Sequence, residues 1–223
     1  MAKPTAFKTP KGTLNWCIIT GDGKENLSGK MKYTTDLVLP TDSEEAKTLI
    51  NFIDDYWDEN KPAKWPAKRP AKSLGYRDET TPVLDEDGQK QYGDDGKVIA
   101  EKTGNTVFTF GTDTTYPSGD PKKVNVFNSK GNKVDLGDRR VGNGSEGRVS
   151  AAIGVYEVKD PKGTITDAGV TLYLNSVQIT KFVAYSGEER WDADDSDDGW
   201  TGEGDSDGWE GEQGEETKPV PRI

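Results

Sequence analysis

The chain of 223 residues contains no histidine and one cysteine, and only 31% of its residues are hydrophobic. The lack of histidine removes the commonest general base and the usual partner of a nucleophilic Ser or Cys, and a single cysteine excludes a disulfide-based fold. The formal net charge of −11 excludes a protein that is basic throughout, so binding of nucleic acid would need a local concentration of cations.

Two strands with a turn between them are predicted first. Residues 13–20 (TLNWCIIT) are rich in β-branched and aromatic side chains, and Gly21 and Gly23 mark the turn. Residues 29–39 (GKMKYTTDLVL) alternate with the period of two that is typical of a strand. We expect one face to lie in the core (Met31, Tyr33, Thr35, Leu37, Leu39) and the other to face water or a ligand (Lys30, Lys32, Thr34, Asp36).

A helix is predicted after this second strand. Asp42 is the expected N-cap, and Glu45, three residues later, completes a capping box. The apolar residues that follow have helical spacing and form one stripe: Ala46, Leu49, Ile50, Ile53 and Trp57. We expect the helix to end near Asn60, because Pro62 cannot continue it.

Residues 61–104 are predicted to be a loop insertion that is rich in proline, lysine and polar residues. Its first part contains the tripeptide Pro-Ala-Lys three times, which favours extended polyproline II structure. As a stiff basic strap, this segment could hold DNA phosphates with Lys64, Lys68 and Arg69 and stack a base on Trp65. A solvated linker explains the same composition equally well.

The remaining strands predict a small barrel or sandwich. They cover residues 106–112, 124–128, 132–136, 148–158 and 170–183, with turns at Ser129–Gly131 and Asp160–Gly163. Five or more antiparallel strands with one helix indicate a mainly β domain in residues 1–187. Cys17 lies in an apolar strand, where a core position is expected rather than a reactive one.

Exposed aromatic residues on these strands suggest a surface for base stacking. In the last strand Val170, Leu172 and Leu174 point inward by alternation, so Tyr173 points outward. The same reasoning turns Tyr156 outward in the strand before it, and Tyr116 follows the end of an earlier strand. Single-stranded DNA is bound by stacking of this kind along a positive groove. Ordinary surface tyrosines remain the simpler explanation.

Cations surround the same strands and their turns. Those expected to hold phosphates on the barrel are Lys30, Lys32, Lys122, Lys123, Lys130, Arg139, Arg140 and Arg148, with Lys133 nearby. They could form one basic face, although solvated surface lysines would give the same pattern. A basic face is compatible with the charge balance of residues 1–187, which hold 26 acidic and 26 basic residues.

The whole charge excess lies in residues 188–223, which hold 14 acidic and 3 basic residues. Many charges and glycines predict a disordered segment, since ordering it would gain little buried apolar surface. Trp191, Trp200 and Trp209 recur among the carboxylates with a regular spacing. Such a tail could imitate phosphates and bases, and its tryptophans could contact partner proteins.

The order of these segments resembles the single-stranded DNA-binding proteins of phage replication, which have an OB-fold body and an acidic C-terminus. The resemblance is carried by KYTTDLVLP (residues 32–40) before the helix, NTVFTF (105–110), NSKGNK (128–133), VGNGS (141–145) and LNSV (174–177) before the tail. It implies an OB-like five-stranded barrel with long loops. It also implies that Tyr156 and Tyr116 stack on bases, that Arg148 and Lys32 hold phosphates, and that the tail contacts replication proteins of phage or host and competes with DNA.

The resemblance therefore predicts a protein that coats single-stranded DNA without sequence preference and without a metal or cofactor. A homo-oligomer or a cooperative filament on DNA is compatible with this expectation. Because no apolar stretch of signal-peptide or membrane-spanning length is present, we expect it in the cytoplasm of the infected bacterial host. Two other functions stay open. One is an acidic interaction or assembly protein that binds basic partners without nucleic acid, and the other is a carboxylate-dependent hydrolase, although we expect no enzyme.

Overall fold

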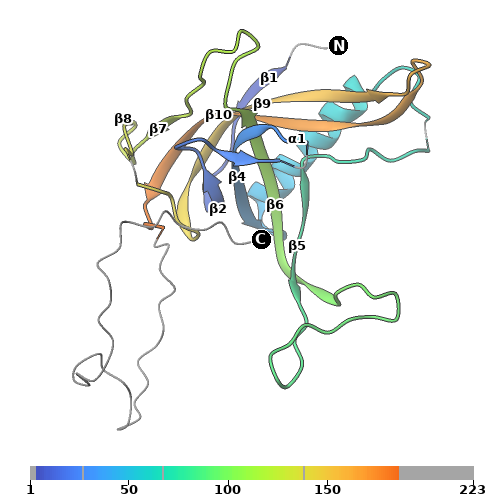
Figure 1. The fold of residues 1–223 in the computed structure, drawn as a ribbon, viewed down its shortest axis with the longest axis horizontal. Helices are drawn as coiled ribbons and strands as arrows, with labels where there is room; N and C mark the ends of the chain where they lie inside the picture. Colours follow the sequence, from blue (N-terminus) through green and yellow to red (C-terminus); the bar gives the residue numbers. More distant parts are fainter. Residues whose placement is uncertain (1–3, 27, 67, 138, 186–223) are drawn as a thin grey trace, which may run out of the picture. The chain divides into compact units, whose positions relative to one another are not determined.

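The computed structural model describes residues 4–26, 28–66, 68–137 and 139–185. They belong to a first compact unit, Met1–Ser186. The elements of this part of the chain are, in order, β1 (Thr5–Lys8), β2 (Gly12–Ile18), β3 (Lys24–Glu25), β4 (Met31–Pro40), α1 (Glu44–Asn60), β5 (Tyr76–Pro82), β6 (Ala100–Asp113), β7 (Asn125–Phe127), β8 (Lys133–Val134), β9 (Ser145–Lys159) and β10 (Ile165–Lys181) (Figure 1).

Five of these strands close into a barrel. β9 pairs with β2, β2 with β4, β4 with β6 and β6 with β10, and β10 returns to β9. This is a small Greek-key barrel of the OB type. The predicted fold class, a mainly β and OB-like five-stranded barrel with one helix, is confirmed.

The sequence pattern had indicated that all strands are antiparallel, but the sheet also contains parallel pairs. β10 runs parallel to β6, with Leu172 opposite Phe110 and Tyr173 opposite Gly111, and it is also parallel to β7. Closure explains the difference, because an odd number of strands cannot form a ring in which every neighbour is antiparallel. The parallel pair β6–β10 places the middle of β10 directly beside the C-terminal end of β6.

The barrel interior is filled by the alternating apolar positions of its strands. In β4, Tyr33, Thr35, Leu37 and Leu39 are buried as predicted, whereas Met31 at the start of the strand is partly exposed. Cys17 is buried in this core as expected, and burial raises the pKa of its thiol to about 11. The thiol therefore stays protonated and unreactive near neutral pH.

Asp36 corrects the prediction for the outer face of β4. It is buried instead of facing water, and its Oδ2 lies 3.1 Å from Nη2 of Arg77 on β5. β5 covers this end of the barrel wall by pairing with β6. The sequence had placed β5 in a loop because its residues (YRDETTP) are polar, and they are polar because β5 is an exposed edge strand.

The helix α1 begins one residue later than predicted. Ser43 is its N-cap and its side chain accepts a hydrogen bond from the Ala46 backbone N–H, so Asp42 is not the cap. Its end at Asn60 is as predicted. Ala46, Leu49, Ile53 and Trp57 of the predicted stripe are buried, with Ile50 half-buried beside them. No helix in the described ranges is long and apolar enough to cross a membrane.

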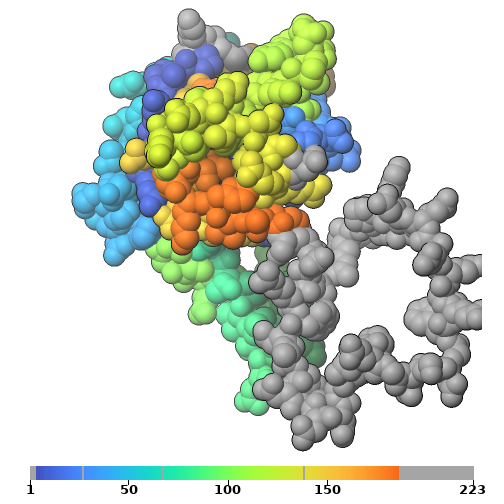
Figure 2. All heavy atoms as spheres, turned by 90° about the vertical axis from the view of Figure 1, so that its left-hand side faces the viewer, coloured from blue at the N-terminus to red at the C-terminus, as the bar shows by residue number. Residues whose placement is uncertain are grey.

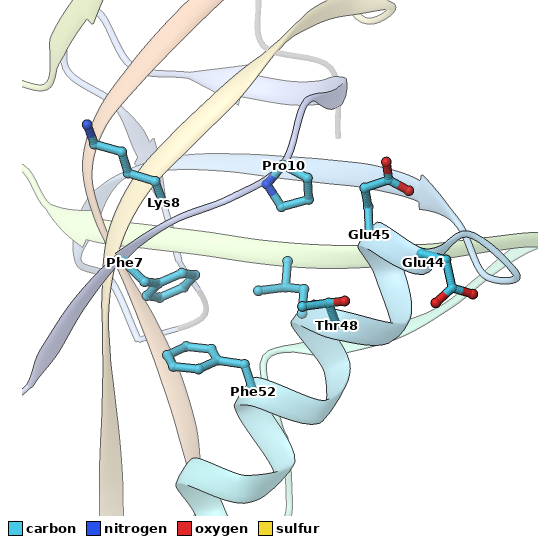
Figure 3. Close-up of a pocket in the computed structure, with 8 residues that line it drawn as sticks. Phe7, Lys8, Pro10, Glu44, Glu45, Thr48 and Phe52 are labelled. Carbon is cyan, nitrogen blue, oxygen red and sulfur yellow. The ribbon is translucent and has the colours of Figure 1, made fainter.

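The helix and the first strand leave an open pocket between them. Phe7 on β1 and Phe52 on α1 face each other there, with their ring centroids 5.0 Å apart (Figure 3). The pocket has a volume of about 460 Å³, and Glu44 and Glu45 lie at the start of the helix beside it.

Hairpins extend from the barrel between β5 and β6, between β7 and β8 and between β9 and β10. β5 and β6 continue into an arm, residues 83–99, that contains two tight turns closed by the bridges Leu84–Lys90 and Tyr92–Val98 (Figure 1). β7 and β8 form the hairpin predicted around Ser129–Gly131. Figure 2 looks at the face on which the yellow-green β7–β8 region, the yellow start of β9 and the orange end of β10 lie side by side.

Candidate nucleic-acid interface

A groove with a volume of about 510 Å³ crosses the outer face of the barrel over β4, β6 and β10. It brings together three of the tyrosines predicted from the sequence, Tyr116, Tyr156 and Tyr173, and two of the predicted cations, Lys32 and Lys122. Between them the groove is lined by small side chains, namely Thr34, Thr109, Gly111 and Thr171. The tyrosine rings therefore stand above a shallow wall that a flat base can approach.

Two of these tyrosines are seated on glycines of the neighbouring strand. A Cβ added to Gly154 of β9 would lie 3.0 Å from Cε2 of Tyr173 on β10. A Cβ added to Gly169 of β10 would lie 2.9 Å from Cε1 of Tyr156 on β9. Each ring fills the space left by the missing side chain, which restricts its movement. A restricted ring loses less conformational entropy when a base stacks on it.

The hydroxyl of Tyr156 stays neutral. Burial raises its pKa, with Asp167 acting in the same direction and Lys72 in the opposite one. Lys72 and Asp167 form an ion pair beside it, with Nζ 2.7 Å from Oδ2. The ring therefore presents an uncharged face and no phenolate that would repel a phosphate.

Tyr116 and Lys122 form the other side of the groove. Tyr116 is 50% exposed and lies in a tight turn that its backbone N–H closes by donating to Asp120 O. Nζ of Lys122 lies 5.6 Å from the centroid of the Tyr116 ring and donates to Oγ1 of Thr112. The lysine is thus held at the groove next to an aromatic face, where a nucleotide presents both a base and a phosphate.

Lys32, by contrast, already has a carboxylate partner, because its Nζ lies 3.2 Å from Oδ1 of Asp113. Both side chains of this pair are partly exposed, so the pair is weak and a phosphate can compete for the lysine. Among the described residues, the members of the predicted phosphate-binding set that pair with a carboxylate are Lys32 and Arg69.

The predicted cations do not all share one groove. Arg148 lines a separate groove of about 420 Å³ with Lys8, next to the β7–β8 turn that carries Lys130. Arg140 lines a third pocket. Arg139 is held by the carbonyl oxygens of Leu136 and Asp135, and Lys30 and Lys123 are exposed. The predicted cations that line pockets are therefore divided among three of them, with Lys32 and Lys122 in the tyrosine groove, Arg148 in the second and Arg140 in the third.

Trp65 is the clearest correction among the predicted stacking residues. It is only 7% exposed, its ring packs edge-on against Trp57 at 6.0 Å, and its Nε1 donates to Arg69 O. Arg69 lies over the ring at 4.7 Å from its centroid. The indole is part of the core and cannot stack on a base.

The Pro-Ala-Lys segment does not extend as polyproline II. It folds into successive turns, in which the N–H of Trp65 donates to Pro62 O and the N–H of Arg69 donates to Pro66 O. Burial of the indole stabilises these turns against the extended form that proline favours. Lys64 and Lys68 are exposed on this segment.

Substituting Trp65 tests this correction. We expect Trp65→Ala to lower the free energy of unfolding by about 3–5 kcal/mol, the usual loss for a buried aromatic side chain. The affinity of the folded protein for single-stranded DNA should stay close to that of the wild type. Urea unfolding and oligonucleotide titration measure the two effects. Normal stability together with weakened binding would restore Trp65 as a DNA contact.

Sequence reasoning missed several exposed aromatic residues, and Trp16 is the most exposed of them among the described residues. It lies in the predicted first strand, where it was assigned no role. Its neighbours Leu14, Cys17 and Ile19 are buried, and their spacing of three and then two breaks the regular alternation. That break is the only trace in the sequence of the irregular backbone that exposes Trp16. The three tail tryptophans, Trp191, Trp200 and Trp209, lie outside the described residues.

Comparison with solved structures finds the same fold in phage proteins. The single-stranded DNA-binding protein gp2.5 of bacteriophage T7 matches with a TM-score of 0.50 at 17% identity, over 93% of this chain and 98% of that one. The single-stranded DNA-binding protein of bacteriophage Enc34 matches with a TM-score of 0.50 at 16% identity, over 84% and 87%. Its C-terminally truncated form matches with a TM-score of 0.50 at 14% identity, over 79% and 85%.

No protein-family model matches the sequence. No curated protein matches it at a significant level either.

Proposed function

We propose that this protein binds single-stranded DNA without sequence preference and coats it during phage DNA replication and recombination, in the cytoplasm of the infected bacterial host. The observation that carries the proposal is the groove over β4, β6 and β10. It combines Tyr116, Tyr156 and Tyr173 with Lys32 and Lys122. The face of the second and third barrel strands is the surface with which OB-type barrels bind oligonucleotides.

The chemistry of the groove supports binding that does not depend on base identity. Every base has a π face, so stacking on tyrosine tolerates all four bases. The lysines act on the phosphate backbone, which is the same in every sequence. The fold adds support, because the phage proteins that share it are single-stranded DNA-binding proteins.

We also propose that residues 188–223 compete with DNA for the barrel and recruit replication proteins of the phage or the host. This segment holds 14 acidic and 3 basic residues together with Trp191, Trp200 and Trp209. Carboxylates and indoles offer a basic protein surface the same kinds of contact as phosphates and bases. Cooperative assembly of several copies on one DNA strand is part of the same proposal.

Deleting residues 188–223 should tighten binding to single-stranded DNA several-fold at low salt. The deletion leaves a body with 26 acidic and 26 basic residues, which no longer repels phosphate through its net charge. The gain should shrink as salt is added, because screening shortens the range of the charges to about 3 Å at 1 M salt. Fluorescence polarisation of a labelled oligo(dT) measures it. Equal affinities of both forms at low salt would contradict the competition.

The direct test of the function compares oligo(dT) with a DNA duplex of equal length in a gel-shift titration. We expect the single strand to be bound much more tightly and to remain intact when magnesium is added. An acidic assembly protein would bind neither DNA, and a hydrolase would shorten the oligonucleotide. Each rival therefore gives its own result.

A further inference from the structure

Trp16 has an unusual backbone and an unusual degree of exposure. It is 65% exposed, and its φ of +49° makes it the only residue other than glycine with a positive φ in the described part of the chain. Left-handed backbone is unfavourable for a residue with a Cβ, and residues strained in this way cluster at active sites and ligand-binding positions. The groove over β4, β6 and β10 makes no use of this side chain.

A β-bulge turns the indole outward. β2 pairs with β4 at Asn15–Asp36 and next at Ile18–Thr34, so β2 has one residue more than its partner between these pairs. The backbone N–H of Trp16 donates to Oδ1 of Asn143 at 2.8 Å, and that of Gly144 donates to Oδ1 of Asn15 at 3.2 Å. These two bonds hold the bulge against the loop before β9. Such bulges serve to redirect a side chain.

A pocket of about 390 Å³ lies beside the exposed indole. Its walls come from the bulge, from the turn Gly21–Lys24, from the loop before β9 and from Tyr185 at the end of the described chain. The walls are tied together, because the N–H of Gly142 donates to Val183 O and that of Tyr185 donates to Arg140 O. The pocket therefore presents two exposed aromatic rings, Trp16 and Tyr185, and the segment that carries Tyr185 is held to the loop before β9.

The charges around Trp16 favour an anion on one side only. The pocket is lined by Arg140 and Lys24, neither of which forms an ion pair among the described residues, and by one carboxylate, Asp22. On its other side Trp16 borders a smaller pocket that contains Asp36 and Glu79 next to Arg77. A phosphate beside the indole would thus be drawn toward Arg140 and away from the acidic side.

This pocket and the tyrosine groove lie along one row of the barrel wall. Ile18 is paired with Thr34, Thr34 with Gly111, and Gly111 with Tyr173, so the row crosses β2, β4, β6 and β10. Neighbouring strands are about 4.8 Å apart, which places β2 about 14 Å from β10 along this row. A stacked strand advances about 3.4 Å per nucleotide, so about four nucleotides bridge the two sites.

We propose that Trp16 and Arg140 form a second DNA subsite, in which the indole stacks on a base that lies several nucleotides away from the tyrosine groove and Arg140 holds the adjoining phosphate. This inference rests on the proposed function and extends it. It gives the bound DNA strand a path over the barrel, which crosses β10, β6 and β4 and reaches β2. The strain at Trp16 is then explained as the means by which the ring reaches the path of the DNA.

Affinity as a function of oligonucleotide length tests the subsite. The full chain, Trp16→Ala and Tyr173→Ala are titrated with two lengths of labelled oligo(dT). One has about 3 nucleotides and is too short to reach both sites, and the other has about 12, within the range of OB-fold site sizes. We expect Trp16→Ala to weaken binding of the longer strand roughly 5- to 150-fold, the usual effect of losing one stacked base, and to leave the shorter strand unaffected. Tyr173→Ala should weaken both.

A second substitution separates binding from folding. Trp16→Gly should fold at least as stably as the wild type, because glycine adopts positive φ without strain, and should lose affinity as Trp16→Ala does. Trp16→Phe should recover part of the affinity. Two results would contradict the subsite, provided that the wild type binds oligo(dT). In one, the Trp16 variants bind the longer strand as tightly as the wild type does. In the other, they lose affinity for both strand lengths equally. If the wild type binds no oligo(dT), the proposed function itself fails.

Discussion

Tyr173→Ala is expected to weaken binding of oligo(dT) roughly 5- to 150-fold, since stacking of one base contributes about 1–3 kcal/mol. Tyr173 is 39% exposed, projects from the middle of β10 and is seated on Gly154. Its removal deletes a stacking face without opening the core, so the free energy of unfolding should change little. Tyr116→Ala should act similarly, and the double variant should lose more than either single one.

Tyr92→Ala is the matched control for these variants. Tyr92 is 63% exposed and lies on the arm between β5 and β6, away from the residues that line the groove. It should bind oligo(dT) as the wild type does. If Tyr92→Ala lost as much affinity as Tyr173→Ala, the effect would belong to surface tyrosines in general and the groove would lose its special role.

The second large effect is expected from Lys122, which should contribute to the salt dependence of binding. Each phosphate contact on single-stranded DNA contributes about 0.7 to the slope of log affinity against log salt concentration. Lys122→Gln should therefore reduce the steepness of this slope by about 0.7 and weaken binding mainly at low salt. Lys122→Glu should weaken it further, because a carboxylate next to Tyr116 repels the phosphate.

Lys90→Gln provides the corresponding control for charge. Lys90 is exposed on the β5–β6 arm, and its removal changes the net charge by the same amount. Titrations of both variants over a range of salt concentrations should show a normal slope for Lys90→Gln and a reduced one for Lys122→Gln. Equal slopes would mean that Lys122 acts only through the overall charge.

Alternation along the strands allowed much of the barrel to be predicted. Inward and outward positions of β9 and β10 follow the period of two, and this placed Tyr156 and Tyr173 on the outer face. The helix was predicted within one residue, because a stripe of apolar residues and a proline mark its extent. These signals are local in the sequence. They predict the structure correctly because each element buries one of its faces, and the pattern of apolar residues marks that face.

The elements that the sequence did not predict are held by partners distant in the chain. β1 is four residues long and exists through its pairing with β9. β5 has no apolar face and is held by its pairing with β6. Asp36 is buried because Arg77, 41 positions later, reaches it from β5. No local pattern encodes such contacts.

The sequence predicted several residues of the candidate site but not how they are placed relative to one another. Tyr156 and Tyr173 were identified by strand alternation and Tyr116 by its place after a strand, and closure of the barrel brings all three together with Lys32 and Lys122. Arg148 and Arg140 were expected beside them, but Arg148 on β9 and Arg140 in the loop before β9 line other pockets. Trp65 was misassigned because proline-rich sequence suggested an exposed strap, whereas its indole packs against Trp57.

The most direct test of the central claim is ultraviolet cross-linking of the full chain to oligo(dT), followed by mapping of the cross-linked residues by mass spectrometry. If the groove over β4, β6 and β10 is the DNA-binding surface, the cross-links will concentrate at Tyr116, Tyr156 and Tyr173. Cross-links confined to the β5–β6 arm or to the groove around Arg148, with those three tyrosines unmodified, would contradict it.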